Sequence, residues 1–239
     1  MKNRADIILT ELKLTRSRSE AADLIKSGKV SVNGKILVKP SQDISPTDDI
    51  KILEENRFVG RGGQKLEKAL AIFKVDVKDA VAVDIGSSTG GFTDCLLKHQ
   101  AKKVFAVDVG TDQLAPELRA NPNVVVMEQT DIRKVDALPE APDLAVIDTS
   151  FISLDKILPK AKELLKPDGK IIALVKPQFE VGADNLNKQG LVKSESLQIE
   201  ALEKVKHTAQ NLGLKIVDET ESPILGGTGN KEFLLYLRK

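Results

Sequence analysis

The stretch VAVDIGSSTGGFTDCLL, residues 81–97, decides the fold of this chain. An apolar run from Val81 to Ile85 ends at Gly86, small or polar residues follow, and an apolar-periodic segment begins at Phe92. A strand, a glycine-rich turn and a helix in this order are typical of the first unit of a nucleotide-binding α/β fold. The alternative interpretation is a purely structural strand-to-helix turn.

The turn fails to match two common phosphate-binding motifs. The dinucleotide fingerprint requires a glycine where this chain has Ser88. The phosphate-binding loop finds its glycines and threonine at the required spacing, but Phe92 stands where the lysine that pairs with the phosphates belongs.

S-adenosylmethionine suits the turn better, because it has no phosphate and carries an amino acid, a sulfonium, a ribose and an adenine. It requires close backbone approach, which glycines permit, and carboxylates rather than lysines. Asp108 lies 22 positions after Gly86 and suits a ribose diol, a feature that a dehydrogenase would share. The residues expected to bind this cofactor are Asp84, Gly86, Ser87, Ser88, Gly90, Gly91, Phe92, Asp108 and Asp131.

The composition is that of a soluble globular protein, with 239 residues, 41% hydrophobic and 30% charged. The single cysteine, Cys95, excludes an internal disulfide and a multi-cysteine metal site. With only two histidines in the chain, we do not expect a histidine-based metal centre. The N-terminus lacks an apolar signal region, and no apolar run approaches the ~18 residues that span a bilayer. We expect a cytoplasmic protein with no metal and no membrane partner.

Residues 1–56 form a first region with its own pattern. Helical patterns at 4–12 and 19–27 are followed by the hairpin signal Asn33-Gly34, and DDIKIL predicts a further strand. Ser17 or Ser19 could cap the second helix. Two helices and a small sheet would make a compact α+β unit of about 50 residues.

Charge is unevenly distributed in this region. Residues 1–35 contain eight Lys or Arg against four acids, whereas residues 36–56 contain two against five. A basic half opposite an acidic half indicates an oriented phosphate-binding face, and a solvated helix pair is the alternative.

The segment SRSEAADLIKSGKVSVNGK, with the hairpin at its end, resembles the RNA-binding domain named after the fourth protein of the small ribosomal subunit. The resemblance implies binding of structured RNA through the basic helix and the hairpin. Residues 57–62 predict a basic, glycine-containing linker, followed by a second domain at 63–239. The residues expected to contact RNA are Arg4, Arg16, Arg18, Lys26, Lys29, Arg57 and Arg61.

The second region alternates between apolar, β-rich runs and helical segments. The runs lie at 81–85, 103–109, 124–127, 143–148, 170–176, 215–218 and 232–237, and the helical segments at 92–98, 112–120, 154–165 and 195–212. Alternation of this kind predicts a mostly parallel, Rossmann-like sheet of seven strands with an antiparallel return strand, the usual methyltransferase architecture. The carboxyl ends of the strands then place one rim of residues together: Gly86, Asp108, Asp131, Asp148 and Lys176.

Four charged residues lie at or beside apolar elements, where burial is costly without a partner: Lys65, Asp148, Lys176 and Glu232. The motifs around them are RGGQKL, DIGSSTGGFTDCLL, VDVG, VIDTSFISL, LVKPQFE and GNKEFLLYL. Together these motifs resemble the TlyA or hemolysin-A-like proteins, which are ribosomal RNA 2′-O-methyltransferases related to the FtsJ group. The resemblance implies that these four residues transfer a methyl group from S-adenosylmethionine to a ribose 2′-hydroxyl of ribosomal RNA, at a cytidine.

Elementary chemistry is consistent with that assignment. A ribose hydroxyl attacks a sulfonium methyl only when it is deprotonated and in line. A lysine with the reference pKa of about 10.4 is a poor base at neutral pH, so a neighbouring ammonium and partial burial are needed. The alternatives are an RNA-binding protein with an inactive methyltransferase domain, a small-molecule methyltransferase and a membrane-lytic hemolysin. Ribosomal RNA or ribosomal subunits are the expected partners.

Overall fold

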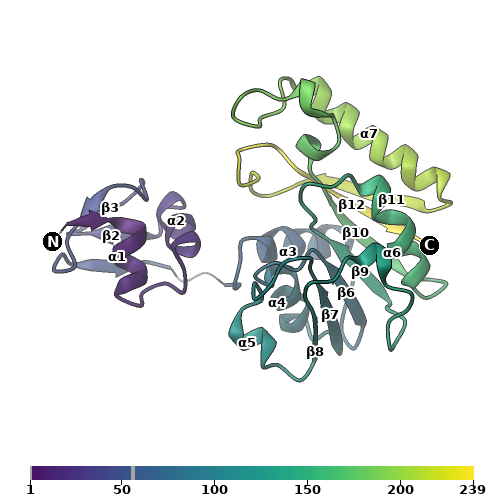
Figure 1. The fold of residues 1–239 in the computed structure, drawn as a ribbon, viewed down its shortest axis with the longest axis horizontal. Helices are drawn as coiled ribbons and strands as arrows, with labels where there is room; N and C mark the ends of the chain where they lie inside the picture. Colours follow the sequence, from purple (N-terminus) through teal and green to yellow (C-terminus); the bar gives the residue numbers. More distant parts are fainter. Residues whose placement is uncertain (1, 55–56) are drawn as a thin grey trace. The chain divides into compact units, whose positions relative to one another are not determined.

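A computed structural model of the chain describes residues 2–54 and 57–239, apart from the side chain of Ser19. The chain divides into two compact units, Met1–Arg61 and Gly62–Lys239, drawn in Figure 1. The boundary predicted at residue 56 lies outside the described residues. The predicted linker at 57–62 overlaps helix α3 (Gly62–Phe73), which begins at the last linker residue.

The first unit contains two helices and two small sheets. The helices are α1 (Ala5–Glu11) and α2 (Arg18–Lys26), and Ser17 caps α2 by accepting a hydrogen bond from the backbone of Glu20 at 3.2 Å. A three-stranded sheet has the order β3 (Lys35–Ile36), β2 (Val30–Val32), β5 (Ile50–Ile52), and β1 (Asn3–Arg4) pairs with β4 (Asp43–Ile44). The hairpin expected at Asn33-Gly34 joins β2 to β3, with both residues at positive φ. The core of the first unit contains the buried side chains of Ile8, Leu9 and Ile25.

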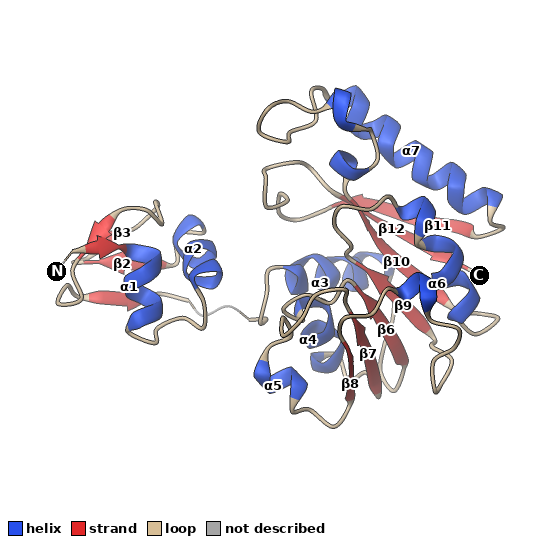
Figure 2. Ribbon diagram, viewed as in Figure 1, coloured by secondary structure: helices blue, strands red, loops and turns tan. Residues whose placement is uncertain are grey.

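The second unit is built on a seven-stranded sheet with the order β11-β12-β10-β9-β6-β7-β8, which confirms the predicted architecture (Figure 2). Strands β6 to β10 run parallel, and β12 is antiparallel to both of its neighbours, β10 and β11. The strands span Val81–Ile85 (β6), Lys103–Val107 (β7), Val124–Met127 (β8), Leu144–Ile147 (β9), Lys170–Val175 (β10), Lys215–Glu221 (β11) and Phe233–Arg238 (β12).

Helices cover both faces of this sheet. Side chains alternate between the faces of a strand, and Val81, Val83 and Ile85 of β6 join the core that α6 (Leu158–Leu164) and α7 (Glu195–Asn211) complete. Ala82 and Asp84 point the other way, where α4 (Gly91–Lys98) packs on β6 and β7 and α3 packs on α4. Because the sheet is covered on both faces, its strands read as continuous apolar runs rather than as alternating ones.

Two predicted helices are shorter than expected, for local reasons. The segment 112–120 is helical only at α5 (Pro116–Arg119), because the backbone N–H groups of Asp112, Gln113 and Leu114 donate to the carboxylate of Glu128 instead. The segment 154–165 is a 3-10 turn (Leu154–Lys156) followed by α6. Pro159 fits only the first turn of a helix, which makes α6 begin next to it.

Candidate functional site

A cavity of about 520 Å³ opens at the carboxyl ends of the parallel strands. Strand β6 lies between β7 and β9, the point at which the strand order reverses, and ligands of open α/β sheets bind at such points. The volume of the cavity falls in the range of small-molecule binding sites. The lining comes from the ends of β6, β7, β8 and β9: Ile85, Gly86, Ser88, Val107, Asp108, Val109, Gln113, Thr130, Asp131, Ile132, Arg133, Asp148, Thr149, Ser150, Phe151, Ile152 and Ile157.

The glycine turn after β6 packs directly on the end of β9. Gly86 has φ +86°, and a Cβ atom there would lie 2.7 Å from the carbonyl oxygen of Asp148. Gly90 has φ +97°, and a Cβ atom would collide with the side chains of Leu114 and Leu118. Both positions therefore require glycine, one for a close approach at the cavity and one for packing beneath the turn.

Asp108, at the end of β7, holds the turn open toward the cavity. Its Oδ2 accepts the backbone N–H of Ser88 at 2.8 Å, and its Oδ1 accepts that of Gly110 at 2.8 Å. A carboxylate oxygen has a second lone pair, so both oxygens can still accept a hydroxyl from a ligand. Ser88 itself has φ +48°, a conformation that this hydrogen bond helps to maintain.

Asp84 lies below the cavity rather than in its wall. It is fully buried, and its Oδ2 accepts a hydrogen bond from Thr93 Oγ1 at 2.7 Å. Its Oδ1 has no hydrogen-bond partner among the described residues. Burial raises the pKa of Asp84 to about 7, although the bond from Thr93 opposes this effect. This side chain joins β6 to α4.

Some of the residues expected to bind the cofactor line the cavity, and others do not. Asp131 lines the cavity, but its carboxylate is paired with Arg133 at 2.6 Å. Of the nine residues expected to bind the cofactor, the structure brings four into the cavity wall: Gly86, Ser88, Asp108 and Asp131. Those that the described lining does not include are Asp84, Ser87, Gly90, Gly91 and Phe92.

The four expected catalytic residues form two ion pairs. Lys176, directly after β10, lies with its Nζ 2.7 Å from Oδ1 of Asp148, directly after β9, and it donates a hydrogen bond to Ser150 Oγ at 2.9 Å. Lys65 of α3 donates to Oε2 of Glu232 at 2.6 Å, and both side chains are buried. The sequence indicated these residues but not which lysine pairs with which carboxylate.

The first turn of α3 lies beside both pairs. A Cβ atom on Gly62 would lie 3.5 Å from Oδ2 of Asp148 and 3.3 Å from the ring of Phe92. Lys65 lies three residues further along this helix, and residues at that spacing share a face. Gly62, the last residue of the predicted linker, is therefore helical, and it allows α3 to approach the rim.

Phe151 is a rim residue that the sequence did not single out. It has φ +63° and its side chain is 92% exposed, while its ring lies 5.2 Å from the ring of Phe179. The Nζ of Lys176 lies 5.9 Å from the centroid of Phe179. An exposed aromatic ring in a strained backbone conformation beside paired charges indicates a ligand-facing position.

Glu180, also not anticipated, connects the two loops that carry Asp148 and Lys176. Its Oε2 accepts the hydroxyl of Ser153 at 2.5 Å and its Oε1 accepts the backbone N–H of Leu154 at 2.8 Å. Burial raises the pKa of Glu180. Because the loops follow different strands, only the folded sheet brings these groups together.

In the first unit, acids pair with several of the residues that are expected to contact RNA. Asp6 pairs with Arg4 at 2.9 Å and with Arg18 at 3.1 Å. Lys29 pairs with Glu54 at 3.0 Å, and Lys26 ends α2 with its side chain exposed.

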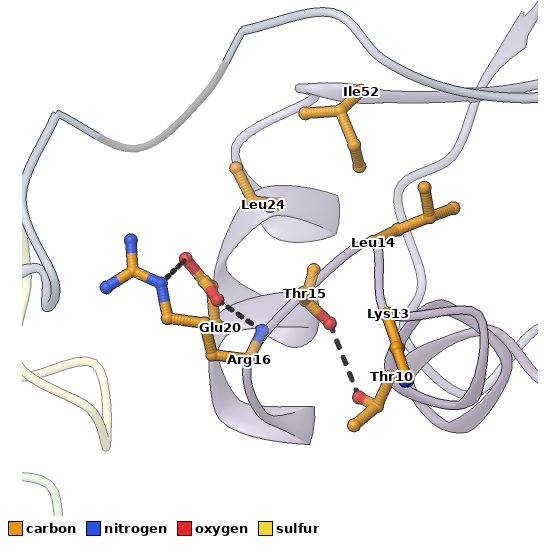
Figure 3. Close-up of a pocket in the computed structure, with 8 residues that line it drawn as sticks. All are labelled: Thr10, Lys13, Leu14, Thr15, Arg16, Glu20, Leu24 and Ile52. Atoms are coloured by element: carbon orange, nitrogen blue, oxygen red, sulfur yellow. Dashed lines mark hydrogen bonds and ion pairs between the residues drawn. The ribbon is translucent and has the colours of Figure 1, made fainter. Parts of the chain in front are cut away.

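A cavity of about 790 Å³ lies on this unit, lined by Thr10, Lys13, Leu14, Thr15, Arg16, Glu20, Leu24 and Ile52 (Figure 3). Glu20 accepts the backbone N–H of Arg16 at 2.7 Å, and its other oxygen lies 3.8 Å from Nε of Arg16. Arg61 lies 3.6 Å from Asp23, and the guanidinium of Arg57 lies 5.4 Å from the centroid of the Phe58 ring.

Within residues 2–54 and 57–239, no three His, Cys, Asp or Glu side chains are grouped so that they could hold a metal ion. Across the same ranges, none of the helices combines the length and the apolarity needed to cross a bilayer.

Comparison with known proteins adds a second line of evidence. The FtsJ-like methyltransferase family matches residues 58–239, and the S4 domain family matches residues 4–50. The chain is 44% identical to "Putative rRNA methyltransferase YqxC" of Bacillus subtilis, over 99% of this chain and 85% of the relative. It is 41% identical to "16S/23S rRNA (cytidine-2'-O)-methyltransferase TlyA" of Mycobacterium tuberculosis, over 98% and 89%. The solved structure "Putative hemolysin from Streptococcus thermophilus" is 42% identical, with a TM-score of 0.80 over 100% of this chain and 88% of that one.

Proposed function

This chain belongs to the FtsJ-like methyltransferase family, with an S4 domain ahead of the methyltransferase domain, and we propose that it transfers a methyl group from S-adenosylmethionine to a ribose 2′-hydroxyl of ribosomal RNA. The observation that carries the proposal is the Lys176–Asp148 pair, in which Asp148 lines the strand-end cavity. The buried Lys65–Glu232 pair involves the first turn of α3, which approaches Asp148 at Gly62. Charged pairs at a ligand cavity are costly to keep without a role in binding or chemistry.

The cavity has the features that the methyl donor requires. Gly86 leaves room for close backbone approach at the turn, and Asp108 offers carboxylate oxygens for the ribose hydroxyls. Asp131 and the apolar side chain of Ile132 suit the adenine end. When bound, S-adenosylmethionine supplies an electrophilic methyl group.

The side chains of the rim suit the activation of a hydroxyl. We assign Lys176 as the group that accepts the proton of the ribose 2′-hydroxyl, with Asp148 and Ser150 holding its amine in place. Only a neutral amine can accept a proton, so the proposed transfer requires that the Lys176–Asp148 contact yields as the hydroxyl enters. Lys65 and Glu232 position the start of α3 against the rim.

A structured RNA fits as the acceptor. An S4 domain with arginines on its surface suits phosphate contacts, and the exposed ring of Phe151 offers a face on which a base can stack. The mycobacterial relative's name specifies cytidine in 16S and 23S ribosomal RNA, and we extend cytidine to this chain as the proposed target. Ribosomal subunits are then the partners, and the cytoplasm is the proposed place of action. We also propose the residue ranges 1–56, 57–62 and 63–239 as binding domain, linker and catalytic domain.

The inactive-domain alternative is disfavoured by the rim, because all four expected catalytic residues are present and paired. The name hemolysin occurs among the relatives, but the paired charges and the strand-end cavity favour group transfer rather than membrane lysis.

The proposal is tested with purified 30S and 50S subunits, free cytidine and S-adenosylmethionine labelled in its methyl group. We expect label in ribosomal RNA, resistant to alkaline cleavage at one ribose, and none in free cytidine. Label on bases, or equal labelling of free cytidine, would contradict the proposal. Lysis of erythrocytes by the same preparation, without labelling, would support the hemolysin alternative.

A further inference from the structure

One buried carboxylate in the first unit holds two arginines at once. Asp6 is 4% exposed, and its Oδ1 lies 2.9 Å from Nε of Arg4 while its Oδ2 lies 3.0 Å from Nη2 of the same guanidinium. The same Oδ2 lies 3.1 Å from Nη2 of Arg18. The two arginines come from different elements, β1 and the start of α2, and they are 14 positions apart in the chain.

The arginines themselves are largely in solvent. The side chain of Arg4 is 44% exposed and that of Arg18 is 59% exposed, against 6% for Asp6. A guanidinium has five N–H donors, and the contacts with Asp6 use only part of each fork. The outward edges can therefore still donate to an oxygen from outside.

The position of Asp6 does not follow from helix stability alone. It lies in the first turn of α1, where an acid is favourable and where Oδ1 also accepts the backbone N–H of Ile7 at 3.1 Å. An exposed carboxylate would serve that purpose. Burial with two cations costs desolvation, and the hydrogen bonds from Arg4, followed by those from Arg18, lower the pKa of Asp6 and keep it ionised.

We infer that Asp6 is a positioning residue for RNA binding, which sets Arg4 and Arg18 side by side as one site for backbone phosphate. The inference rests on the proposed RNA-binding function of this unit. Flexible arginines lose rotamer freedom when they bind, and a carboxylate that has already ordered them reduces that cost. Phosphate is the ligand that paired, planar guanidinium forks recognise best.

A positioning role for Asp6 and a simple charge effect predict opposite changes in RNA affinity when this carboxylate is removed. Removing a negative charge from an RNA-binding face should strengthen RNA binding if Asp6 only adds charge. If Asp6 orders the arginines, Asp6→Asn should weaken binding at least about 5-fold, the effect of freeing two long side chains. The number of phosphate contacts stays the same, so the dependence of affinity on salt should keep its slope.

The experiment measures binding of the full chain to purified 30S and 50S subunits over a salt series. Glu11→Gln is the matched control, because it removes an exposed acid from the same helix, and it should bind equally or more tightly. Arg18→Ala should bind more weakly, with a salt slope reduced by about one. Circular dichroism melts and S-adenosylmethionine binding verify that each variant is folded.

A double-mutant comparison separates positioning from general structure. In an Arg4→Ala, Arg18→Ala background, Asp6→Asn should cause no further loss, because the residues through which it acts are gone. A further loss there, or wild-type or tighter binding by Asp6→Asn alone, would overturn the inference. If Asp6→Asn does not fold, the double variant Arg4→Lys, Arg18→Lys replaces it in the test, because lysine keeps both positive charges but not the planar guanidinium forks. Undiminished affinity of this double variant for the ribosomal subunits would overturn the inference. Equal RNA-binding affinity of wild type and Arg18→Ala would instead count against the proposed RNA-binding function of this unit.

Discussion

At the scale of single residues, Lys176 is the side chain on which the proposed chemistry depends. An arginine at this position could still pair with Asp148 and Ser150, but it cannot lose its proton at any ordinary pH. If Lys176 accepts the proton, Lys176→Arg and Lys176→Ala should both slow methyl transfer by about 10²–10⁴-fold. Single-turnover rates at saturating donor and ribosomal subunits measure this effect.

The matched control for that comparison is Lys193→Arg, because Lys193 is an exposed lysine of the same unit whose amine donates a hydrogen bond to the backbone carbonyl of Asp184. Its rate should equal that of wild type. A Lys176→Arg enzyme with most of its activity would show that the residue supplies charge rather than a base, while the methyltransferase assignment would stand.

Asp84 carries a prediction about pH and stability. Its pKa is about 7 in the folded chain and about 3.9 in an unfolded one, so between these values the folded state holds a proton that the unfolded state has lost. The free energy of unfolding that the protonated Asp84 contributes at low pH is therefore lost as pH rises from about 4 to 7. Asp84→Asn keeps the shape and removes the titration.

Thermal midpoints of wild type and Asp84→Asn at pH 5 and pH 8 measure that difference. The fall in midpoint between the two pH values should be smaller in the variant. The amide leaves a donor in the place of Oδ1, so both midpoints of the variant can be lower; only the change with pH bears on the prediction. An equal fall in both proteins would show that Asp84 does not titrate in this range.

At the scale of elements, the turn between β6 and α4 connects donor binding to the catalytic rim. Gly86→Ala would strain the backbone at φ +86° and press on the carbonyl of Asp148. We expect weaker S-adenosylmethionine binding and slower transfer, because the same displacement moves the cavity wall and Asp148. Calorimetric titration of the donor and single-turnover rates measure both effects.

Gly182→Ala separates strain from collision. Gly182 has φ +82°, close to the φ of Gly86, but nothing lies within 4 Å of a Cβ atom there. Both variants strain the backbone, because both residues have positive φ, but only Gly86→Ala should change donor affinity. Equal donor affinity in the two variants would remove the proposed connection between the turn and the rim.

At the scale of the whole molecule, the two units divide the proposed work between binding and chemistry. Each has its own core, so deletion of residues 1–56 should leave the second unit folded. The shortened chain should still bind S-adenosylmethionine, because the cavity is lined entirely by the second unit, but it should lose methylation of ribosomal subunits. Donor titration and label transfer on the same preparation check both halves of the prediction, and full transfer by the shortened chain would show the first unit to be dispensable.

The sequence by itself determined the architecture of both units, because burial leaves a local pattern. Continuous apolar runs separated by helical periods predicted a sheet covered on both faces, and Asn33-Gly34 predicted the hairpin between β2 and β3. Strand ends in a parallel sheet meet at one rim, so Gly86, Asp108 and Asp148 could be placed together without coordinates.

Only the tertiary structure decided which partners those residues have. Lys65 and Glu232 are 167 positions apart, and they meet because β12 inserts between β10 and β11, an order that no local pattern specifies. Asp84 was expected at the donor but points to α4, since adjacent residues of a strand face opposite sides of the sheet. Asp6 was counted as one acid among basic residues, and its contact with two arginines depends on how β1 and α2 pack. Periodicity records whether a side chain is buried, whereas ion pairing depends on distances between elements that only the folded chain establishes.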